Sequence, residues 1–224
     1  MKRYILLTLL ILPFSILFAQ QSKIGNLIMY SGNQEIKNNW VFNNDIQHRS
    51  YNAFDDLETF IVRLGIGKNL KPNNNNLSMG TIFIKSAPYT PGTNIKTDKF
   101  EFRIYQQFIA KQQFQRFYLQ HRFRFEERFT DAGFKTRFRY LTGLNLPINK
   151  KEMLPKAFYL SLYNELFLNT SNRLFDRTRI YGAIGNQLTK SLKLEMGLMR
   201  QVYQKTGRTQ FQIAFFNNLP LYKG

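Results

Sequence analysis

The chain contains no cysteine, so it can form neither a disulfide framework nor a cysteine-linked lipid anchor. Acidic residues are scarce: 14 Asp and Glu stand against 32 Lys and Arg, which gives a formal net charge of +18. Histidine occurs only twice. Without Cys, paired His or a His–carboxylate cluster at ligand spacing, the sequence argues against a metal site. We predict no catalytic residue, no metal and no cofactor.

Long apolar runs are also missing beyond the first residues. A basic pair at residues 2–3 precedes an apolar segment over residues 4–18, and the small residue Ala19 follows. This order is typical of a cleaved secretory signal peptide. We therefore predict a signal peptide over residues 1–19, cut near Ala19, and one domain over residues 20–224; an uncleaved anchor helix is the alternative. No transmembrane helix is expected in the domain, because no second run of about eighteen apolar residues follows.

Aromatic residues, by contrast, are abundant, with 22 Phe and 12 Tyr. In the stretch 114–129, FQRFYLQHRFRFEERF, they alternate with charged residues. One parity carries Phe117, Phe123 and Phe125, and the other carries Arg122 and Arg124. A period of two residues indicates a β-strand. A strand of this length, apolar on one face and ionised on the other, predicts a membrane-spanning barrel with the charges inside.

Similar two-faced runs recur along the chain, separated by turn residues such as Gly, Pro, Asn and Asp. The predicted strands are 23–31, 36–50, 57–70, 76–86, 98–110, 114–129, 133–147, 156–169, 174–188, 191–204 and 207–217. The fold class is therefore all-β: a single antiparallel transmembrane-type β-barrel of ten to twelve strands. Twelve is favoured, because bacterial single-chain barrels have even strand numbers.

The polar parity of these runs predicts one cluster of charges in the barrel lumen. Its members are Glu101, Arg103, Arg122, Arg124, Glu126, Arg137, Arg139, Glu165, Arg177, Arg179 and Glu195. Carboxylates in such a place should be paired, since an unpaired buried charge is costly. The favoured interpretation is a structural Arg–Glu lattice. The alternative is an anion-selective path or an anionic ligand site, which the excess of Arg over Glu supports.

The remaining candidate sites are explained without a catalytic or metal-binding role. His48 and His121 fall on the parity assigned to lipid, which counts against a Ser/His catalyst in the barrel wall. Asp55 and Asp56 lie between strands, and a solvated loop is favoured over a calcium site. The expected partners are the lipid bilayer and its anionic lipids, with a small anionic solute as a candidate. No nucleic-acid partner is predicted, because the arginines alternate with Phe inside strands, and the oligomeric state stays open.

Four motifs in fixed order carry a resemblance to a known family. They are an R-F-R-x-E-x-R-F strand within 121–129, an R-x-R-Y strand at 137–140, an N-E-x-F strand at 164–167 and a D-x-x-R-x-Y strand within 175–181. The chain resembles the uncharacterised bacterial domain-of-unknown-function family 2490, common in Bacteroidota. The resemblance implies an outer-membrane β-barrel-like architecture and supplies no catalytic residue.

The sequence thus predicts a non-enzymatic barrel of the bacterial outer membrane with an Arg/Glu-lined lumen. Its role would be structural, or that of a narrow pore for small anionic solutes. Two alternatives stay open: a membrane-embedded lipid-modifying enzyme, and a soluble exported lipid-binding barrel whose apolar parity points inward.

Overall fold

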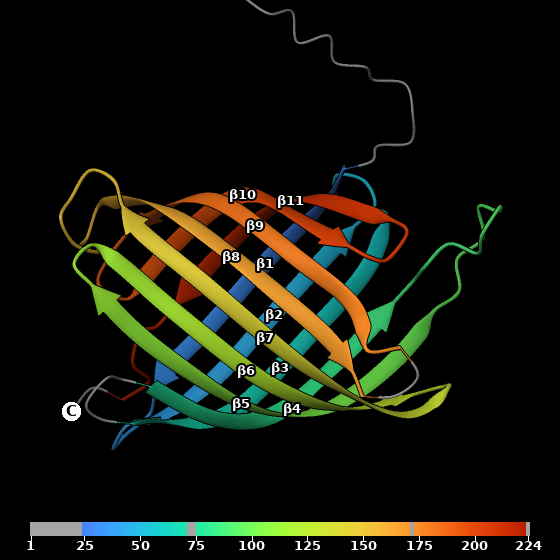
Figure 1. Ribbon diagram of the computed structural model, residues 1–224, viewed down its shortest axis with the longest axis horizontal. Helices are drawn as coiled ribbons and strands as arrows, with labels where there is room; N and C mark the ends of the chain where they lie inside the picture. The colour runs from blue at the N-terminus through green and yellow to red at the C-terminus, as the bar shows by residue number, and fades with distance from the viewer. Residues whose placement is uncertain (1–23, 71–74, 171–172, 223–224) are drawn as a thin grey trace, which may run out of the picture.

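The computed structural model describes residues 24–70, 75–170 and 173–222, so the predicted signal peptide lies outside the described residues. The described part of the chain forms eleven β-strands (Figure 1). These are β1 (Ile24–Glu35), β2 (Trp40–Ser50), β3 (Leu57–Leu70), β4 (Asn75–Ser86), β5 (Lys99–Phe114), β6 (Phe117–Thr130), β7 (Gly133–Pro147), β8 (Ala157–Asn169), β9 (Phe175–Gln187), β10 (Leu192–Val202) and β11 (Gly207–Asn217). In these residues no helix has the length and apolar character needed to cross a membrane.

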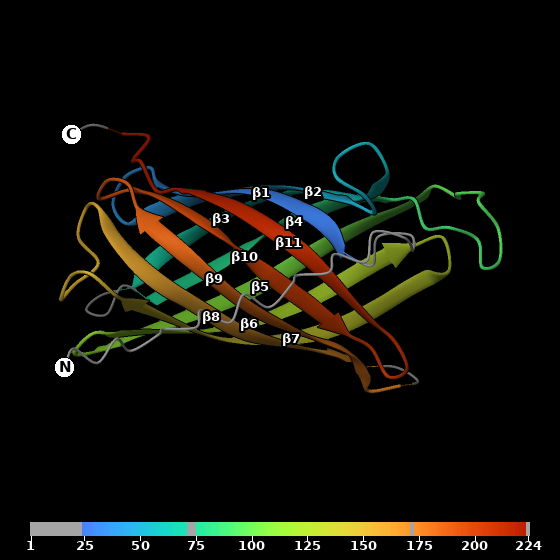
Figure 2. The same ribbon diagram turned by 90° about the horizontal axis from the view of Figure 1, so that it is seen from above.

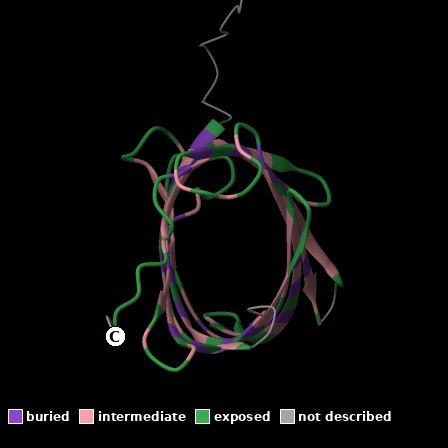
Figure 3. Ribbon diagram, turned by 90° about the vertical axis from the view of Figure 1, so that its left-hand side faces the viewer, coloured by how far each residue is buried: buried purple, intermediate pink, exposed green. Residues whose placement is uncertain are grey.

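The strands follow one another in chain order around a closed barrel (Figures 1 and 2). One end carries the connections 51–56, 87–98, 131–132 and 203–206, and we call it the Tyr89 end. The other carries the connections 36–39, 115–116, 148–156 and 188–191, and we call it the Lys190 end. Viewed from the Lys190 end, the barrel has an oval outline (Figure 3).

The barrel closes through one parallel pair. β1 lies beside β11 with both strands running the same way, from Ile24 opposite Thr209 to Gly32 opposite Asn217, while the other neighbours are antiparallel. The predicted single β-barrel is confirmed, and eleven lies within the expected range of ten to twelve strands. The expectation of an even number, with twelve favoured, is wrong for the described residues, which form eleven strands. In an up-and-down barrel with an odd number of strands the first and last strands run the same way, so the barrel closes through a parallel pair.

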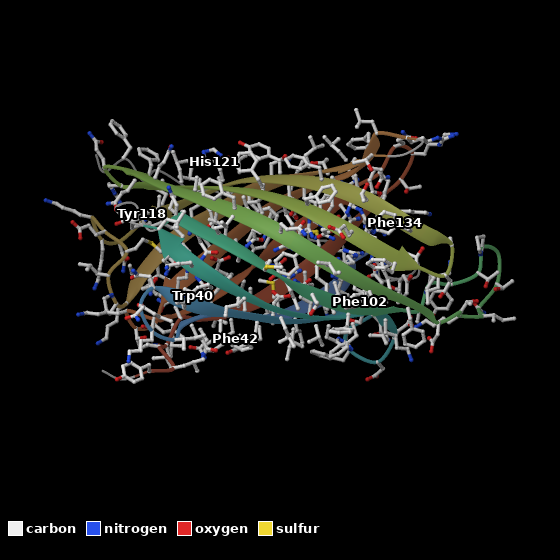
Figure 4. The ribbon with its side chains drawn as sticks, turned by 90° about the horizontal axis from the view of Figure 1, so that it is seen from below. Trp40, Phe42, Phe102, Tyr118, His121 and Phe134 are labelled. Atoms are coloured by element: carbon white, nitrogen blue, oxygen red, sulfur yellow. The ribbon has the colours of Figure 1, made fainter. Side chains whose placement is uncertain are left out.

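The two faces of the wall differ as the alternation predicts. On β6, 39% of Phe123 is exposed on the outer surface, whereas the next residue, Arg124, is 3% exposed. Large apolar side chains cover the outside of other strands too, among them Leu77, Phe83, Phe100, Phe134, Ile184 and Leu198. Of the outward aromatic residues labelled in Figure 4, Trp40 lies toward the Lys190 end, and Phe102 and Phe134 lie toward the Tyr89 end. Many charged and amide groups lie on the inward parity, beside apolar clusters such as Ile61, Ile82 and Ile84.

Some glycines of the wall make room for tyrosines that lie flat against its inner surface. A Cβ added at Gly185 would lie 2.2 Å from Cζ of Tyr159, which occupies the opposite position on β8. At Gly65 it would lie 2.3 Å from the Tyr105 hydroxyl. Both tyrosines are buried. Glycine is thus required at these positions because an aromatic ring crosses the strand, not because of an unusual backbone angle.

Gly185→Ala should therefore destabilise the barrel by about 1–3 kcal/mol, the usual cost of overpacking a filled interior. The matched control is Gly143→Ala on the inner wall of β7, where a new Cβ would meet its nearest neighbour, Leu141, at 3.5 Å. Urea unfolding of both variants measures the difference. Equal free energies of unfolding would contradict the close packing of Tyr159 on Gly185.

Candidate functional site

A cavity of about 1270 Å³ occupies the interior of the barrel. Its walls include Tyr51 and Pro88 at the Tyr89 end, and Lys190 and Lys193 at the Lys190 end. Between the ends, most of its ionic side chains come from β5 to β9. The cavity therefore reaches residues of both ends of the barrel and is lined mainly by charge at its centre.

Glu126 on β6 is the first centre of the ionic network. Its side chain is fully buried and accepts hydrogen bonds from Arg137 at 2.6 Å, Arg139 at 2.6 Å and Arg103 at 3.3 Å. Strand register produces this arrangement, because Arg137 on β7 lies directly opposite Glu126 and Arg139 is two residues further along the same face. One carboxylate thus pairs with three guanidinium groups from two strands, β5 and β7.

Glu165 on β8 is the second centre. It accepts hydrogen bonds of 2.6 Å from both Arg122 and Arg139, and Arg179 Nη1 lies 3.7 Å from its other oxygen. Arg139 therefore links the two carboxylates, since it also binds Glu126. The network is continuous from β5 to β9.

Phe167 on β8 provides an aromatic surface inside this network. It is 1% exposed, and the guanidinium groups of Arg137, Arg139, Arg177 and Arg179 lie 5.2, 4.4, 5.4 and 4.7 Å from its ring centre. Arginine is weakly hydrated and stacks well on aromatic faces. The ring therefore stabilises a density of like charge that the carboxylates alone would not balance.

The two other predicted carboxylates, Glu101 and Glu195, have different partners. Glu101 binds Arg103 at 2.7 Å and Arg128 at 2.5 Å. Glu195 on β10 is held instead by hydroxyl groups, with Tyr159 donating at 3.0 Å and Tyr181 at 3.2 Å.

The structure places the predicted charge cluster on the inner wall. Its members are Glu101, Arg103, Arg122, Arg124, Glu126, Arg137, Arg139, Glu165, Arg177, Arg179 and Glu195. All of them border the cavity except Glu126, which the arginines cover. Glu195 differs from the expected Arg–Glu pairing, because tyrosines satisfy its carboxylate.

Sequence reasoning missed several luminal charges. On β2 and β3, Asp45 lies 3.0 Å from Arg63, and Arg49 is buried beside Gln47. The alternation Asn43, Asp45, Gln47, Arg49 was a usable signal for an inward polar face. At the start of β9, Asp176 lies 3.0 Å from Arg137 and 3.2 Å from Arg177. Its parity gave no such signal, because the register of β8 and β9 shifts there: Phe167 pairs with Arg177 and Leu168 with Phe175, which leaves Asp176 as the extra residue on β9.

The connections at the Tyr89 end are fastened to each other. The Asp56 carboxylate forms an ion pair with Lys96 and accepts a hydrogen bond of 2.8 Å from the Tyr89 hydroxyl. Lys96 also lies over the rings of Tyr51 and Tyr89. Partial burial by itself raises the pKa of Asp56, but the hydrogen bonds from Lys96 and Tyr89 outweigh it and hold that pKa below its usual value. Asp56 thus joins connection 51–56 to connection 87–98.

The histidines lie apart from the charged lumen. His121 is on the outward parity of β6, where its Nδ1 lies 2.9 Å from the Tyr140 hydroxyl (Figure 4). His48 shares the outward parity of β2 with Ile46, which is exposed. Among the residues that the structure describes, no three His, Asp or Glu side chains gather in a way that could hold a metal ion.

A closed wall, an apolar outer surface and an Arg/Glu network inside define a β-barrel protein with a charged lumen. The chain belongs to the family described as Protein of unknown function (DUF2490), whose model matches residues 25–212. The match runs from β1 into β11 and confirms the resemblance seen in the strand motifs. Searches of curated proteins and of solved structures find nothing that matches this chain.

Glu126→Gln should destabilise the barrel strongly, because Arg103, Arg137 and Arg139 would lose a shared charge. Breaking a buried pair costs ~3–5 kcal/mol, and water in the lumen should reduce that figure. Glu127→Gln is the matched control: Glu127 is the next residue, and its contact is an exposed hydrogen bond of 3.3 Å from Gln106. Urea unfolding measures both variants, and equal losses would refute the role of Glu126.

The contact between connections 51–56 and 87–98 should weaken in acid. The pKa of Asp56 in the folded protein lies below its unfolded value of about 4. The ionised carboxylate therefore stabilises the contact fully above pH ~4, and this stabilisation is lost as the pH falls through the folded pKa. Hydrogen-exchange protection of residues 87–98 should therefore drop in acid, and Asp56→Asn should lower it at neutral pH. Asp55→Asn, at the exposed neighbour, is the control. Protection in Asp56→Asn that matches the wild type would contradict this contact.

Proposed function

We propose that this protein spans the bacterial outer membrane as a β-barrel, exported by the signal peptide predicted over residues 1–19. The observation that carries the proposal is the orientation of the wall: apolar side chains point out and charged side chains point in. Phe100 is 61% exposed and Leu198 53%, whereas Glu126 is 0% exposed. A lipid bilayer is the solvent in which that outer surface is favourable.

Backbone hydrogen bonding supports the same proposal. In hydrocarbon every backbone N–H and C=O needs an internal partner, and a closed barrel is one of the two structures that provide it. The parallel contact between β1 and β11 leaves this barrel without an open edge. A soluble barrel that carries lipid would need the reverse orientation, with the apolar parity around the ligand.

Within the membrane we propose a narrow route for small anions. The cavity reaches both ends of the barrel, and its basic groups outnumber its carboxylates. Lys111, Lys190 and Lys193 line it as well, on strands or connections near the Lys190 end. Rings of basic side chains favour anions through their local potential. The role is non-enzymatic, in that the lumen attracts an anion and does not transform it.

A structural lattice is the second candidate function. Glu126 and Glu165 each bind several arginines, so the guanidinium groups tie β5, β6, β7 and β8 together on the inner wall. Such a lattice would stiffen the barrel without conducting. The conductance measurement below separates the two candidates.

Membrane insertion should distinguish the two faces of β6. Phe123→Arg places a charge on the outer surface, at a cost of ~2–4 kcal/mol near the bilayer midplane. Arg124→Gln leaves a polar group in the lumen and should be tolerated. The measurement is the yield of heat-modifiable barrel in the outer-membrane fraction. Equal yields, or wild-type protein recovered in the soluble periplasm, would refute the proposed location.

Conductance should favour anions. Reversal potentials across a planar bilayer under a salt gradient test this, and the selectivity should fall as salt screens the wall. The double variant Lys111→Gln/Lys193→Gln removes two cavity-lining charges and should lower anion selectivity. Lys68→Gln is the control, since Lys68 lies beside the outward Trp40 ring. Cation selectivity would refute the charge argument, and a non-conducting barrel would favour the lattice.

A further inference from the structure

Several buried guanidinium nitrogens of the lumen have no hydrogen-bond partner in the described part of the chain. They include Arg49 Nε, Arg63 Nε, Arg122 Nε and Arg124 Nη1. A buried donor without an acceptor costs free energy, and more so when it is charged. All four side chains line the central cavity. The arginines of the cavity wall thus keep N–H groups that no acceptor of the described protein uses.

Three of these arginines belong to one region. Arg63 is on β3, whereas Arg122 and Arg124 are on β6, with β4 and β5 between them around the wall. Arg124 nevertheless reaches the neighbourhood of Arg63, because it lies over the Tyr105 ring and the Tyr105 hydroxyl lies against Gly65, two residues beyond Arg63 on β3. Arg63 and Arg122 are the arginines whose charges act most on it. Like charges held together in a partly dry interior repel one another. An anion between them would remove that repulsion and accept their free N–H groups.

Arg124 is held in place with one edge left over. The Gln107 side-chain oxygen accepts hydrogen bonds from Arg124 Nε, at 2.9 Å, and from Arg124 Nη2. The guanidinium lies over the Tyr105 ring, 4.8 Å from its centre, and Tyr105 is itself buried against Gly65. Nη1 is the nitrogen that stays unbonded. Arg124 is therefore held in place by Gln107 and Tyr105 with one guanidinium nitrogen unbonded.

Neighbouring carboxylates are already engaged. Asp45 binds Arg63 through Nη1 at 3.0 Å and accepts a hydrogen bond from Gln47. Glu165 Oε1 receives both Arg122 and Arg139. Glu126 Oε1 lies 3.7 Å from Arg124 Nη1, beyond hydrogen-bond distance, and binds Arg139 at 2.6 Å. The protein thus leaves positive charge at this place that a ligand could balance.

We propose that Arg63, Arg122 and Arg124 form a binding site for a small divalent oxyanion within the lumen. Guanidinium groups match oxyanions such as phosphate or a dicarboxylate, whose oxygens accept two N–H groups at once. The site deepens the proposed anion route and rests on it for the access of the anion. Its contacts come from the buried donors themselves.

Isothermal titration of the detergent-solubilised barrel tests the site. Inorganic phosphate is the first probe and succinate the second, each titrated at constant ionic strength with sodium chloride. Phosphate should bind saturably with one site per chain. Arg124→Gln should weaken binding by about tenfold or more, as expected for the loss of a hydrogen bond to a charged group. Heat-modifiable mobility on a gel confirms that each variant is folded.

Two further variants separate a specific site from general charge. Arg128→Gln removes a luminal arginine whose hydrogen bonds go to Glu101, so it should keep the wild-type affinity. Arg124→Lys keeps the charge but cannot bond Gln107 twice and still present a fixed N–H, so it should bind as weakly as Arg124→Gln. Full recovery by Lys, or equal weakening by Arg128→Gln, would overturn the site.

Other outcomes separate the site from the proposed route. A folded barrel that conducts anions but binds neither probe saturably would refute the site and leave the route standing. The free N–H groups would then be hydrated only. Saturable binding in a barrel that does not conduct would support the site and refute the route.

Discussion

The inner wall of this barrel depends on carboxylates that each form ion pairs with several arginines. Glu126 binds Arg103, Arg137 and Arg139, and Glu165 binds Arg122 and Arg139. Buried charges are tolerated only when they are paired and hydrogen-bonded. The antiparallel register of β6, β7 and β8 meets that condition, because it sets acids and bases of neighbouring strands within reach. The charged interior therefore depends on strand order more than on any single strand.

The outer surface follows from the same alternation. Every inward charge on β6 is flanked by outward residues such as Phe123 and Phe125, so a strand that contributes to the network also contributes to the apolar surface. Closure by the parallel β1–β11 contact completes this surface around the barrel. The proposed membrane location, the proposed anion route and the proposed oxyanion site thus share one structural origin, the period of two residues along each strand.

Much of the fold could be predicted because it depends on local alternation. The run at 133–147 coincides with β7 and the run at 57–70 with β3. The even-number rule gave the wrong strand count, because this barrel closes through a parallel pair, β1 with β11. That pair joins residues far apart in the chain. No local pattern encodes it.

The candidate site was predictable to the extent that parity determines it. The charges of β6 and β7 were found from alternation alone. Partners were less predictable: Glu195 binds Tyr159 and Tyr181, because side-chain reach across the wall decides its contacts. Asp176 was missed because it lies at the start of β9, near a bulge that disturbs the register. The place of Phe167 among four guanidinium groups depends on four strand positions at once.

The orientation of the wall in a lipid bilayer tests this account most directly. Because the chain has no cysteine, single-cysteine spin labels can be placed along β6 one at a time. After reconstitution in lipid, labels at Phe117, Phe123 and Phe125 should collide freely with oxygen dissolved in the hydrocarbon, and labels at Gln120, Arg122 and Arg124 should not. The reverse pattern, or no alternation along β6, would contradict a barrel with its apolar surface in lipid and its charges inside.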